Sequence, residues 1–191
     1  MNPFSHVLLT QRSMYFSFEI CPATQADFLD YWASRYDYPD EGAYTANIGK
    51  PLSEKSLLAL FKWKNGRSIS KLKTASIHTN YRLPFRGNPK ERYLNHDKPG
   101  GAIWNIFFLH CVDPETWPIF DQHTFRAMRY LQSGIIVEIG KTKREQCAAY
   151  EEYREFLENF KGYDQRSVDK ALFSFGRFLK LASPYVRDLA W

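Results

Sequence analysis

Apolar residues recur every three or four positions along most of the chain, which is the spacing of one face of an α-helix. This pattern predicts helices, in chain order, over residues 24–36, 53–65, 68–81, 102–112, 122–132, 147–160 and 167–182. A shorter helix is expected around residues 90–94. Residues 14–20 alternate like a short strand or an extended lead-in, and residues 135–140 fit either a strand or a helix. The predicted fold class is therefore mostly α.

Capping residues mark several of the expected helix boundaries. Thr24, Ser53 and Asp121 each precede a helical pattern and carry a side-chain oxygen that can accept from the first free amides. Pro184 is expected to end the last helix, because proline lacks the amide proton that a helix interior needs. Residues 36–51, rich in Tyr, Pro and Gly, are expected to form a long loop, which is often functional.

The chain has 191 residues, of which 44% are hydrophobic, so it can form one domain or two closely packed lobes. Its three cysteines, Cys21, Cys111 and Cys147, are odd in number and far apart, which argues against a disulfide framework and fits a reducing cytoplasm. The first residues do not resemble a signal peptide, and no apolar run approaches the length of a membrane span.

The formal net charge of +5 suits a polyanionic partner, because cations that contact phosphates release counterions and favour association. Several basic residues gather between residues 70 and 95 and are candidates for a DNA-facing surface: Lys71, Lys73, Arg82, Arg86, Lys90 and Arg92. A solvated helix face is the ordinary alternative for about half of such residues.

Two short segments carry the candidate chemistry. Pro99-Gly100-Gly101 begins a helix, where exposed backbone amides and the positive end of the helix dipole can bind a phosphate. Asp121 begins the next helix twenty residues later. Taken alone, Asp121 is an ordinary N-cap, but a carboxylate held there can also stabilise a sugar cation or orient a water molecule.

Together the two segments resemble the helix-hairpin-helix DNA glycosylases. In that family a Pro-Gly-x-Gly hairpin precedes, by about twenty residues, a segment of the form Pro-(Ile/Val)-x-Asp-x-(His/Asn)-Val-x-Arg. Here PGGAIWNIFF is similar to the hairpin and its helix, and PIFDQHTFRAMRYL is similar to the catalytic segment. VDKALFSFG, residues 168–176, is a weaker echo of a late helix. The resemblance covers about 45 residues and does not extend to the N-terminal third.

The resemblance implies a two-lobed helical glycosylase domain over residues 1–191, with a cleft for DNA and the base between the lobes. The lobe that contains both motifs is expected at residues 51–139, and the other at 1–50 together with 140–191. It also implies that the protein acts on double-stranded DNA as a monomer and needs no cofactor.

Individual roles follow from the same resemblance. Asp121 matches the catalytic aspartate. The residues that match the hairpin or the expected DNA-contacting positions are Pro99, Gly100, Gly101, His123, Arg126, Lys98 and Arg86. His123 and Arg126 lie on the helix after the aspartate, where such residues either support the fold or touch DNA.

Departures from the family pattern narrow the expected chemistry. The hairpin is PGG instead of PGxG, which leaves its register open. Members that also cut the strand carry a nucleophilic lysine just after the hairpin, where this chain has Ala102, Ile103 and Trp104. That argues for a monofunctional enzyme that uses water. The four-cysteine iron–sulfur loop of some members is missing from the sequence.

A base in duplex DNA has to be flipped out before it is cleaved, so the enzyme needs a pocket with aromatic faces and hydrogen-bond donors. Tyr36, Tyr44 and Asn47 are one candidate wall, and Trp63 and Lys64 are another. Packing against helices is the ordinary alternative for each. A loop rich in tyrosine suits a roomy pocket for a bulky modified base.

The motifs do not identify the modified base that is removed. The chain resembles, less closely, bacterial defence glycosylases that remove modified cytosines from phage DNA, which favours glucosylated 5-hydroxymethylcytosine. Repair of oxidised or alkylated bases is one alternative, with strand cleavage if Lys64 or Lys98 supplied the nucleophile. A DNA-binding module without activity is another. A metal site is disfavoured, because none of the usual short metal motifs is present. Its candidate ligands would be His110, Cys111, Asp113, Asp121 and His123.

Overall fold

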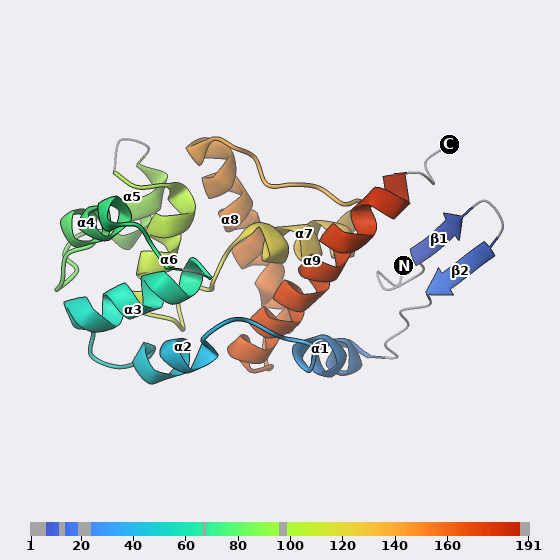
Figure 1. The fold of residues 1–191 in the computed structure, drawn as a ribbon, viewed down its shortest axis with the longest axis horizontal. Helices are drawn as coiled ribbons and strands as arrows, with labels where there is room; N and C mark the ends of the chain where they lie inside the picture. The colour runs from blue at the N-terminus through green and yellow to red at the C-terminus, as the bar shows by residue number, and fades with distance from the viewer. Residues whose placement is uncertain (1–6, 12–13, 19–23, 67, 96–98, 188–191) are drawn as a thin grey trace. The chain divides into compact units, whose positions relative to one another are not determined.

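The computed structural model describes the backbone of residues 7–11, 14–18, 24–66, 68–95 and 99–187. Within these residues there are nine α-helices, one 3-10 helix and a single two-stranded hairpin (Figure 1). The mostly α fold is therefore confirmed. Lys98, an expected DNA-binding residue, lies outside the described residues.

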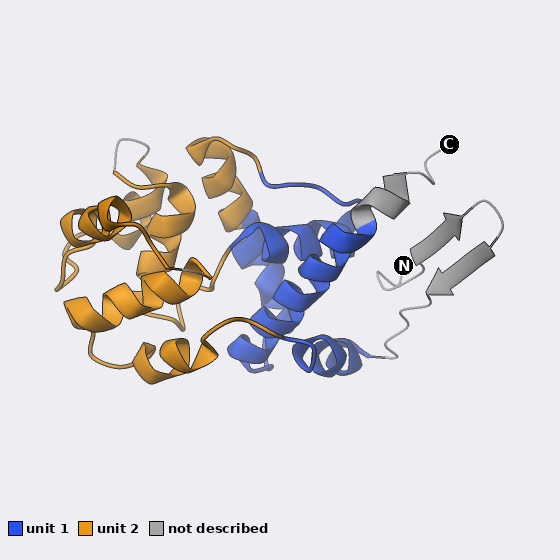
Figure 2. Cartoon of the chain, in the orientation of Figure 1, with its two compact units in different colours: residues 1–36, 121–139, 152–191 blue, residues 37–120, 140–151 orange. Residues whose placement is uncertain are grey.

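The chain divides into two compact units, which are described separately (Figure 2). Unit 1 comprises residues 1–36, 121–139 and 152–191, and unit 2 comprises residues 37–120 and 140–151. The bounds of these units differ from those of the expected lobes. Residues 37–50 and 140–151 belong to unit 2, and residues 121–139 belong to unit 1. As a result, the turn formed by Pro99, Gly100 and Gly101 lies in unit 2, and Asp121 lies in unit 1.

Unit 1 is built around the last helix. Its elements are β1 (Val7–Gln11), β2 (Met14–Phe18), α1 (Gln25–Ala33), α7 (Gln122–Ser133), the end of α8 (Lys143–Leu157), η1 (Glu158–Phe160) and α9 (Gln165–Arg187). The two strands pair antiparallel, with Val7 opposite Phe18 and Gln11 opposite Met14. The strand expected within residues 14–20 is thus found at Met14–Phe18.

The core of unit 1 forms where α1 and α7 pack against α9. Phe175 of α9 lies at the centre, and the ring centroids of Phe28 and Trp32 on α1 are 5.4 and 5.0 Å from it. Tyr130 of α7 approaches the same ring to 5.7 Å. The rings of Phe28, Trp32 and Phe175 lie on the apolar helix faces that the sequence predicted. Fully burying an aromatic ring of this kind contributes about 1.5–3 kcal/mol.

Unit 2 consists of short helices around the apolar helix α6. Its elements are α2 (Glu41–Asn47), α3 (Glu54–Lys64), α4 (Lys71–Asn80), α5 (Pro89–Leu94), α6 (Ala102–Val112) and the start of α8. Phe107 and Phe108 of α6 are almost completely buried, as are Leu60 and Phe61 of α3. The start of α8 packs on α5, where the Cys147 thiol donates to a backbone carbonyl oxygen at 2.9 Å.

Side-chain caps fix where most of these helices begin. Thr24 and Ser53 form capping boxes at α1 and α3, as the sequence predicted. A further box explains why α8 begins at Lys143, four residues before the expected start. There the hydroxyl of Thr142 accepts from the amide of Glu145, whose carboxylate accepts from the Thr142 amide.

Two further expectations were wrong: that residues 36–51 form a loop, and that Pro184 ends the last helix. Helix α2 lies inside the segment expected to be a loop. It is short, and its N-cap Asp40 adopts a positive φ of 58° without a side-chain capping bond, so the usual signal for a helix start is missing. Helix α9 continues through Pro184 to Arg187, so that proline does not end it. Residues 135–140, left open between strand and helix, have neither structure.

The closest approach between α7 and α9 occurs at Gly176. A Cβ atom at this position would overlap the backbone carbonyl of His123. Because the obstacle is backbone, no change of side-chain rotamer can relieve it. Glycine at 176 is therefore what allows the start of α7 to rest directly on α9.

We predict that Gly176→Ala lowers the free energy of unfolding by about 2–3 kcal/mol, because overpacking forces the two helices apart. Urea denaturation followed by circular dichroism measures the loss. Gly42→Ala is the control, since it adds a Cβ to a helical glycine that has no atom within 4 Å of the new carbon, and it should cause no loss. Equal stability of Gly176→Ala and the wild-type protein would contradict this account of the α7–α9 contact.

Candidate functional site in two parts

The carboxylate of Asp121 is held at the start of α7 by the backbone. Its Oδ1 accepts hydrogen bonds from the amides of His123 at 2.8 Å and Thr124 at 3.2 Å. The Thr124 hydroxyl in turn accepts from the Asp121 amide at 3.0 Å, which completes a capping box. The side chain is half-buried. The structure thus shows the capping role and fixes the orientation of the carboxylate.

Arg126 is a buried structural residue. None of its surface is exposed, and its Nε and Nη2 donate to the Glu138 carboxylate at 3.1 and 2.7 Å. Its Nη1 donates to the Gly176 carbonyl at 2.9 Å and to Nδ1 of His123 at 3.1 Å. The expected alternatives were fold support or DNA contact, and a guanidinium enclosed in this way supports the fold.

His123 connects Asp121 to the surface of α9. Its ring centroid lies 5.0 Å from that of Phe173, edge to face. Because a guanidinium can only donate, Nδ1 of His123 accepts from Arg126, and the proton of the neutral ring lies on Nε2. Burial lowers the pKa of His123 below 6.5, with Arg126 and Lys180 acting in the same direction and Asp121 opposing them. At neutral pH His123 is therefore uncharged.

The hairpin in unit 2 is shaped by the side chains beneath it. Gly100 has a φ of +88°, and a Cβ there would overlap the hydroxyl of Tyr81 and approach Oδ1 of Asn105 at 3.3 Å. Both of those residues are buried, and burial raises the pKa of Tyr81 to about 12, against the opposing effect of Arg92. Glycine at 100 is thus required by conformation and by space.

Among the residues that the structure describes, the start of α6 beside this turn has no side-chain cap. Gly101 is the N-cap, it is exposed, and it provides no side-chain capping bond. The Nζ of Lys73 lies 4.6 Å from the ring centroid of Trp104, in the first turn of α6, and donates to Asn65 at 2.7 Å. Pro99 is exposed as well. The turn, the first amides of α6 and a lysine are therefore brought together within unit 2.

The remaining expected basic residues fall into two groups. Arg92 stacks on Tyr81, with its Cζ 4.7 Å from the ring centroid, and donates to the Asn80 carbonyl at 2.5 Å, which makes it a packing residue. The others have exposed side chains: Lys71, Arg82, Arg86 and Lys90.

The expected base-pocket residues of unit 2 mostly pack against one another. Tyr44 and Trp63 are 6% and 4% exposed, and their ring centroids are 4.3 Å apart. The Tyr44 hydroxyl donates to Nε2 of His110, whose Nδ1 donates to a backbone carbonyl. Neither ring offers an open face to a base, so helix packing, the ordinary interpretation, describes these two residues.

Of the other three pocket candidates, Asn47 and Lys64 contact residues of unit 2, and Tyr36 lies in unit 1. Asn47 donates to the Ala43 carbonyl at 2.7 Å, one helical turn back. The Nζ of Lys64 is 5.7 Å from the ring centroid of Phe107. Tyr36 belongs to unit 1, separately from the others.

Comparison of the chain with protein-family models, curated proteins and solved structures found no match. Among the residues that the structure describes, no group of three or more His, Cys, Asp or Glu side chains is arranged to hold a metal ion. No described helix is both long and apolar enough to cross a bilayer. The case for function therefore rests on the geometry around Asp121 in unit 1 and, separately, on the geometry around Gly100 in unit 2.

We predict that NMR titration of the His123 ring gives a pKa below 6.5, because burial disfavours the imidazolium. Asp121→Asn should lower that pKa further, since the carboxylate favours the cation, and Lys180→Gln should raise it. Asp164→Asn is the control, because it replaces the N-cap aspartate of α9 by asparagine just as Asp121→Asn does for α7. A pKa at or above 6.5 would show that the ring is not enclosed as described.

The lowered pKa of His123 also makes the free energy of unfolding depend on pH. Because the unfolded chain binds a proton to this histidine more readily than the folded chain, the stabilisation from neutral His123 is complete above pH 6.5. It is lost as the pH falls from 6.5 to the lower pKa of the folded state.

Proposed function

We propose that the protein is a monofunctional DNA glycosylase that hydrolyses the bond between a flipped base and its sugar. The observation that carries this proposal is the fixed, half-buried carboxylate of Asp121, oriented by the amides of His123 and Thr124. Two amide donors and the positive end of the helix dipole favour its charged form. A preorganised negative charge of this kind is what a cationic sugar transition state requires.

In the proposed reaction, the bond between C1′ and the base nitrogen breaks and its electron pair leaves with the base. The positive charge that develops on the sugar is stabilised by the Asp121 carboxylate. A water oxygen then bonds to C1′ and loses a proton, directly or through the carboxylate. The departed base takes up one proton, so that the products are the neutral base and an abasic site. No co-reactant other than water is needed.

The hairpin supports DNA as the partner. The start of α6 provides an exposed glycine turn and uncapped amides, and Lys73 adds a positive charge beside them. Such an arrangement binds a phosphate oxygen without reading sequence. In the proposed enzyme it holds the DNA backbone, while Asp121 acts on the sugar.

The proposed substrate is a modified base, with glucosylated 5-hydroxymethylcytosine of phage DNA as the first candidate and antiviral defence as the role. Oxidised or alkylated bases, removed in base-excision repair, are the alternative. Incubation with ordinary, oxidised, alkylated and phage-modified DNA, followed by detection of free base and alkali-labile sites, distinguishes them.

A DNA-binding module without catalytic activity is a second candidate, and one observation favours it. The Asp121 carboxylate already completes a capping box, so capping alone accounts for an aspartate at this position. This candidate retains the role of the hairpin and assigns no chemistry to Asp121. The two candidates differ in a single measurable property, which is base release.

We predict that Asp121→Asn reduces base release at least 100-fold while leaving the fold nearly unchanged and DNA affinity equal to or above that of the wild type. The asparagine keeps an oxygen that can cap α7 and loses only the negative charge. Single-turnover release of base from the substrate found in the panel measures the effect.

Asp164→Asn is a matched control for that variant. Asp164 caps α9 by accepting from the amide and hydroxyl of Ser167 at 2.7 and 2.8 Å, so its substitution also removes a helix-capping carboxylate from unit 1. Activity of Asp164→Asn should equal that of the wild type. Wild-type rates of base release from Asp121→Asn would exclude Asp121 from the chemistry and support the non-catalytic candidate.

We predict that borohydride traps no covalent adduct between the protein and its substrate DNA. The first turn of α6 carries Ala102, Ile103 and Trp104 and no amine that could form a Schiff base. A trapped adduct would show that a lysine from elsewhere acts as nucleophile, and Lys64→Gln and Lys98→Gln would identify it.

A further inference from the structure

Four basic residues follow one face of α9. Arg166, Lys170, Arg177 and Lys180 are separated by four, seven and three residues, so their side chains leave the helix on the same side. Phe173 occupies the position between the two pairs on that face. With a rise of about 1.5 Å per residue, this basic row extends about 21 Å along the helix.

The basic row passes beside the start of α7. Phe173 contacts the His123 ring, and Gly176, one residue before Arg177, rests against the His123 backbone. The charge of Lys180 is close enough to lower the pKa of His123. The Asp121 carboxylate accepts from the His123 amide and also acts on the pKa of that ring, so the row and the proposed catalytic carboxylate both lie close to His123.

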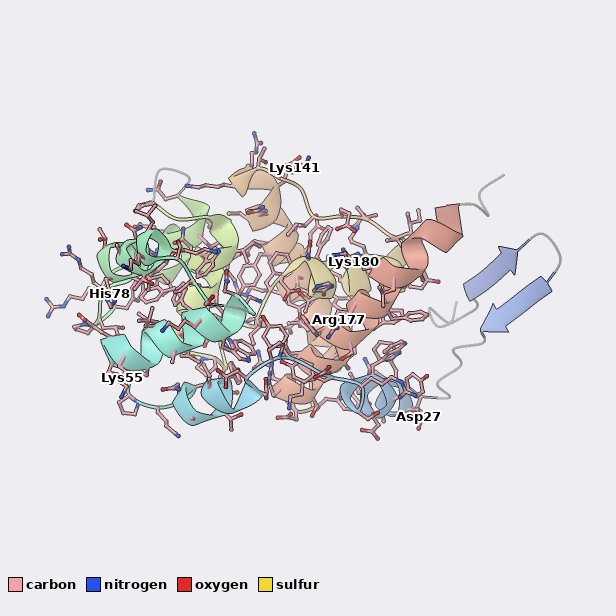
Figure 3. The ribbon with its side chains drawn as sticks, in the orientation of Figure 1. Asp27, Lys55, His78, Lys141, Arg177 and Lys180 are labelled. Carbon is pink, nitrogen blue, oxygen red and sulfur yellow. The ribbon has the colours of Figure 1, made fainter. Side chains whose placement is uncertain are left out.

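The two halves of the basic row differ in how their side chains are held. Arg166 forms an ion pair with Asp169 and donates to the Tyr36 hydroxyl at 2.9 Å, and the Nζ of Lys170 lies 5.3 Å from the Tyr36 ring centroid. Arg177 and Lys180, labelled in Figure 3, are exposed, and the Cζ of Arg177 lies 5.8 Å from the Phe173 ring centroid. Of the four side chains in the row, these two are the more exposed.

The backbone amides at the start of α7 are not expected to bind an anion. Those of His123 and Thr124 already donate to the Asp121 carboxylate. An anion that approaches this end of α7 also meets the negative charge of Asp121. The positive charge that a phosphate would need is provided here by the side chains of the basic row.

We propose that the basic row binds the sugar-phosphate backbone of the DNA strand that carries the target nucleotide, with Arg177 and Lys180 contacting phosphates next to it. A single file of charges matches a linear polyanion better than the flat surface of an anionic membrane. Binding of phosphates by Arg177 and Lys180 offsets their repulsion by Asp121 and brings a sugar to the carboxylate. The choice of DNA rests on the proposed function, but the row is tested by binding alone.

The experiment compares Arg177→Gln/Lys180→Gln with the wild type by fluorescence anisotropy of a labelled DNA duplex over a range of salt concentrations. Loss of two phosphate contacts should reduce the slope of log affinity against log salt by about 1.8. Affinity near physiological salt should fall about tenfold or more. Arg177→Lys/Lys180→Arg keeps both charges and should retain the wild-type slope.

Lys55→Gln/Lys141→Gln is the matched control, because it removes two exposed charges from unit 2 and alters net charge equally (Figure 3). If this variant and Arg177→Gln/Lys180→Gln show the same slope, the basic row does not contact phosphate and the proposal is overturned. Loss of binding to phosphatidylserine vesicles with unchanged binding to duplex would overturn it in favour of a membrane. Base release by Asp121→Asn bears on neither result, so the two proposals fail separately.

Discussion

The buried guanidinium of Arg126 is the interaction on which unit 1 depends. It joins three segments that are far apart in the sequence: its own helix α7, the irregular stretch that contains Glu138, and α9 at Gly176. The guanidinium is fully buried although the Glu138 side chain is 56% exposed, so loss of that carboxylate would leave a buried charge without its charged partner. The glycine that lets α7 approach α9 also supplies a carbonyl that accepts from Arg126. Close packing and charge compensation therefore act together to hold the start of α7 against α9.

Local patterns in the sequence predicted most helices because their causes are local. Thr24 and Ser53 cap the helices that follow them, and the apolar run of α6 is buried as expected. The missed start of α8 also had a local signal, the pair Thr142 and Glu145 at capping-box spacing. Helix α2 had no such local signal in the sequence, since its N-cap Asp40 makes no side-chain capping bond. What local patterns could not supply was the division into units, which depends on contacts between distant residues.

The candidate site shows the same limit. Asp121 as a cap followed from residue type and position. The requirement for glycine at 100 did not, because it depends on a φ of +88° and on the nearby Tyr81 hydroxyl. The burial of Arg126 did not, because its partner Glu138 lies in a stretch with no helical or strand pattern. Tyr44 and Trp63 were expected to face a ligand, yet they face each other, since a sequence rich in aromatic residues does not say which rings pair. A glycine within the helical pattern at 176 was the one available sign of a close helix contact.

Capping and catalysis are compatible demands on Asp121. Catalysis by a charged group is most effective when the group is already oriented, because no free energy is then spent on arranging it during the reaction. The capping bonds from His123 and Thr124 supply that orientation, and Arg126 holds the His123 ring against α9. The neutral state of His123 matters in this arrangement, since an imidazolium next to Asp121 would compete with a sugar cation for the same carboxylate. The enclosure that lowers the pKa of His123 thus keeps an imidazolium charge away from the Asp121 carboxylate at neutral pH.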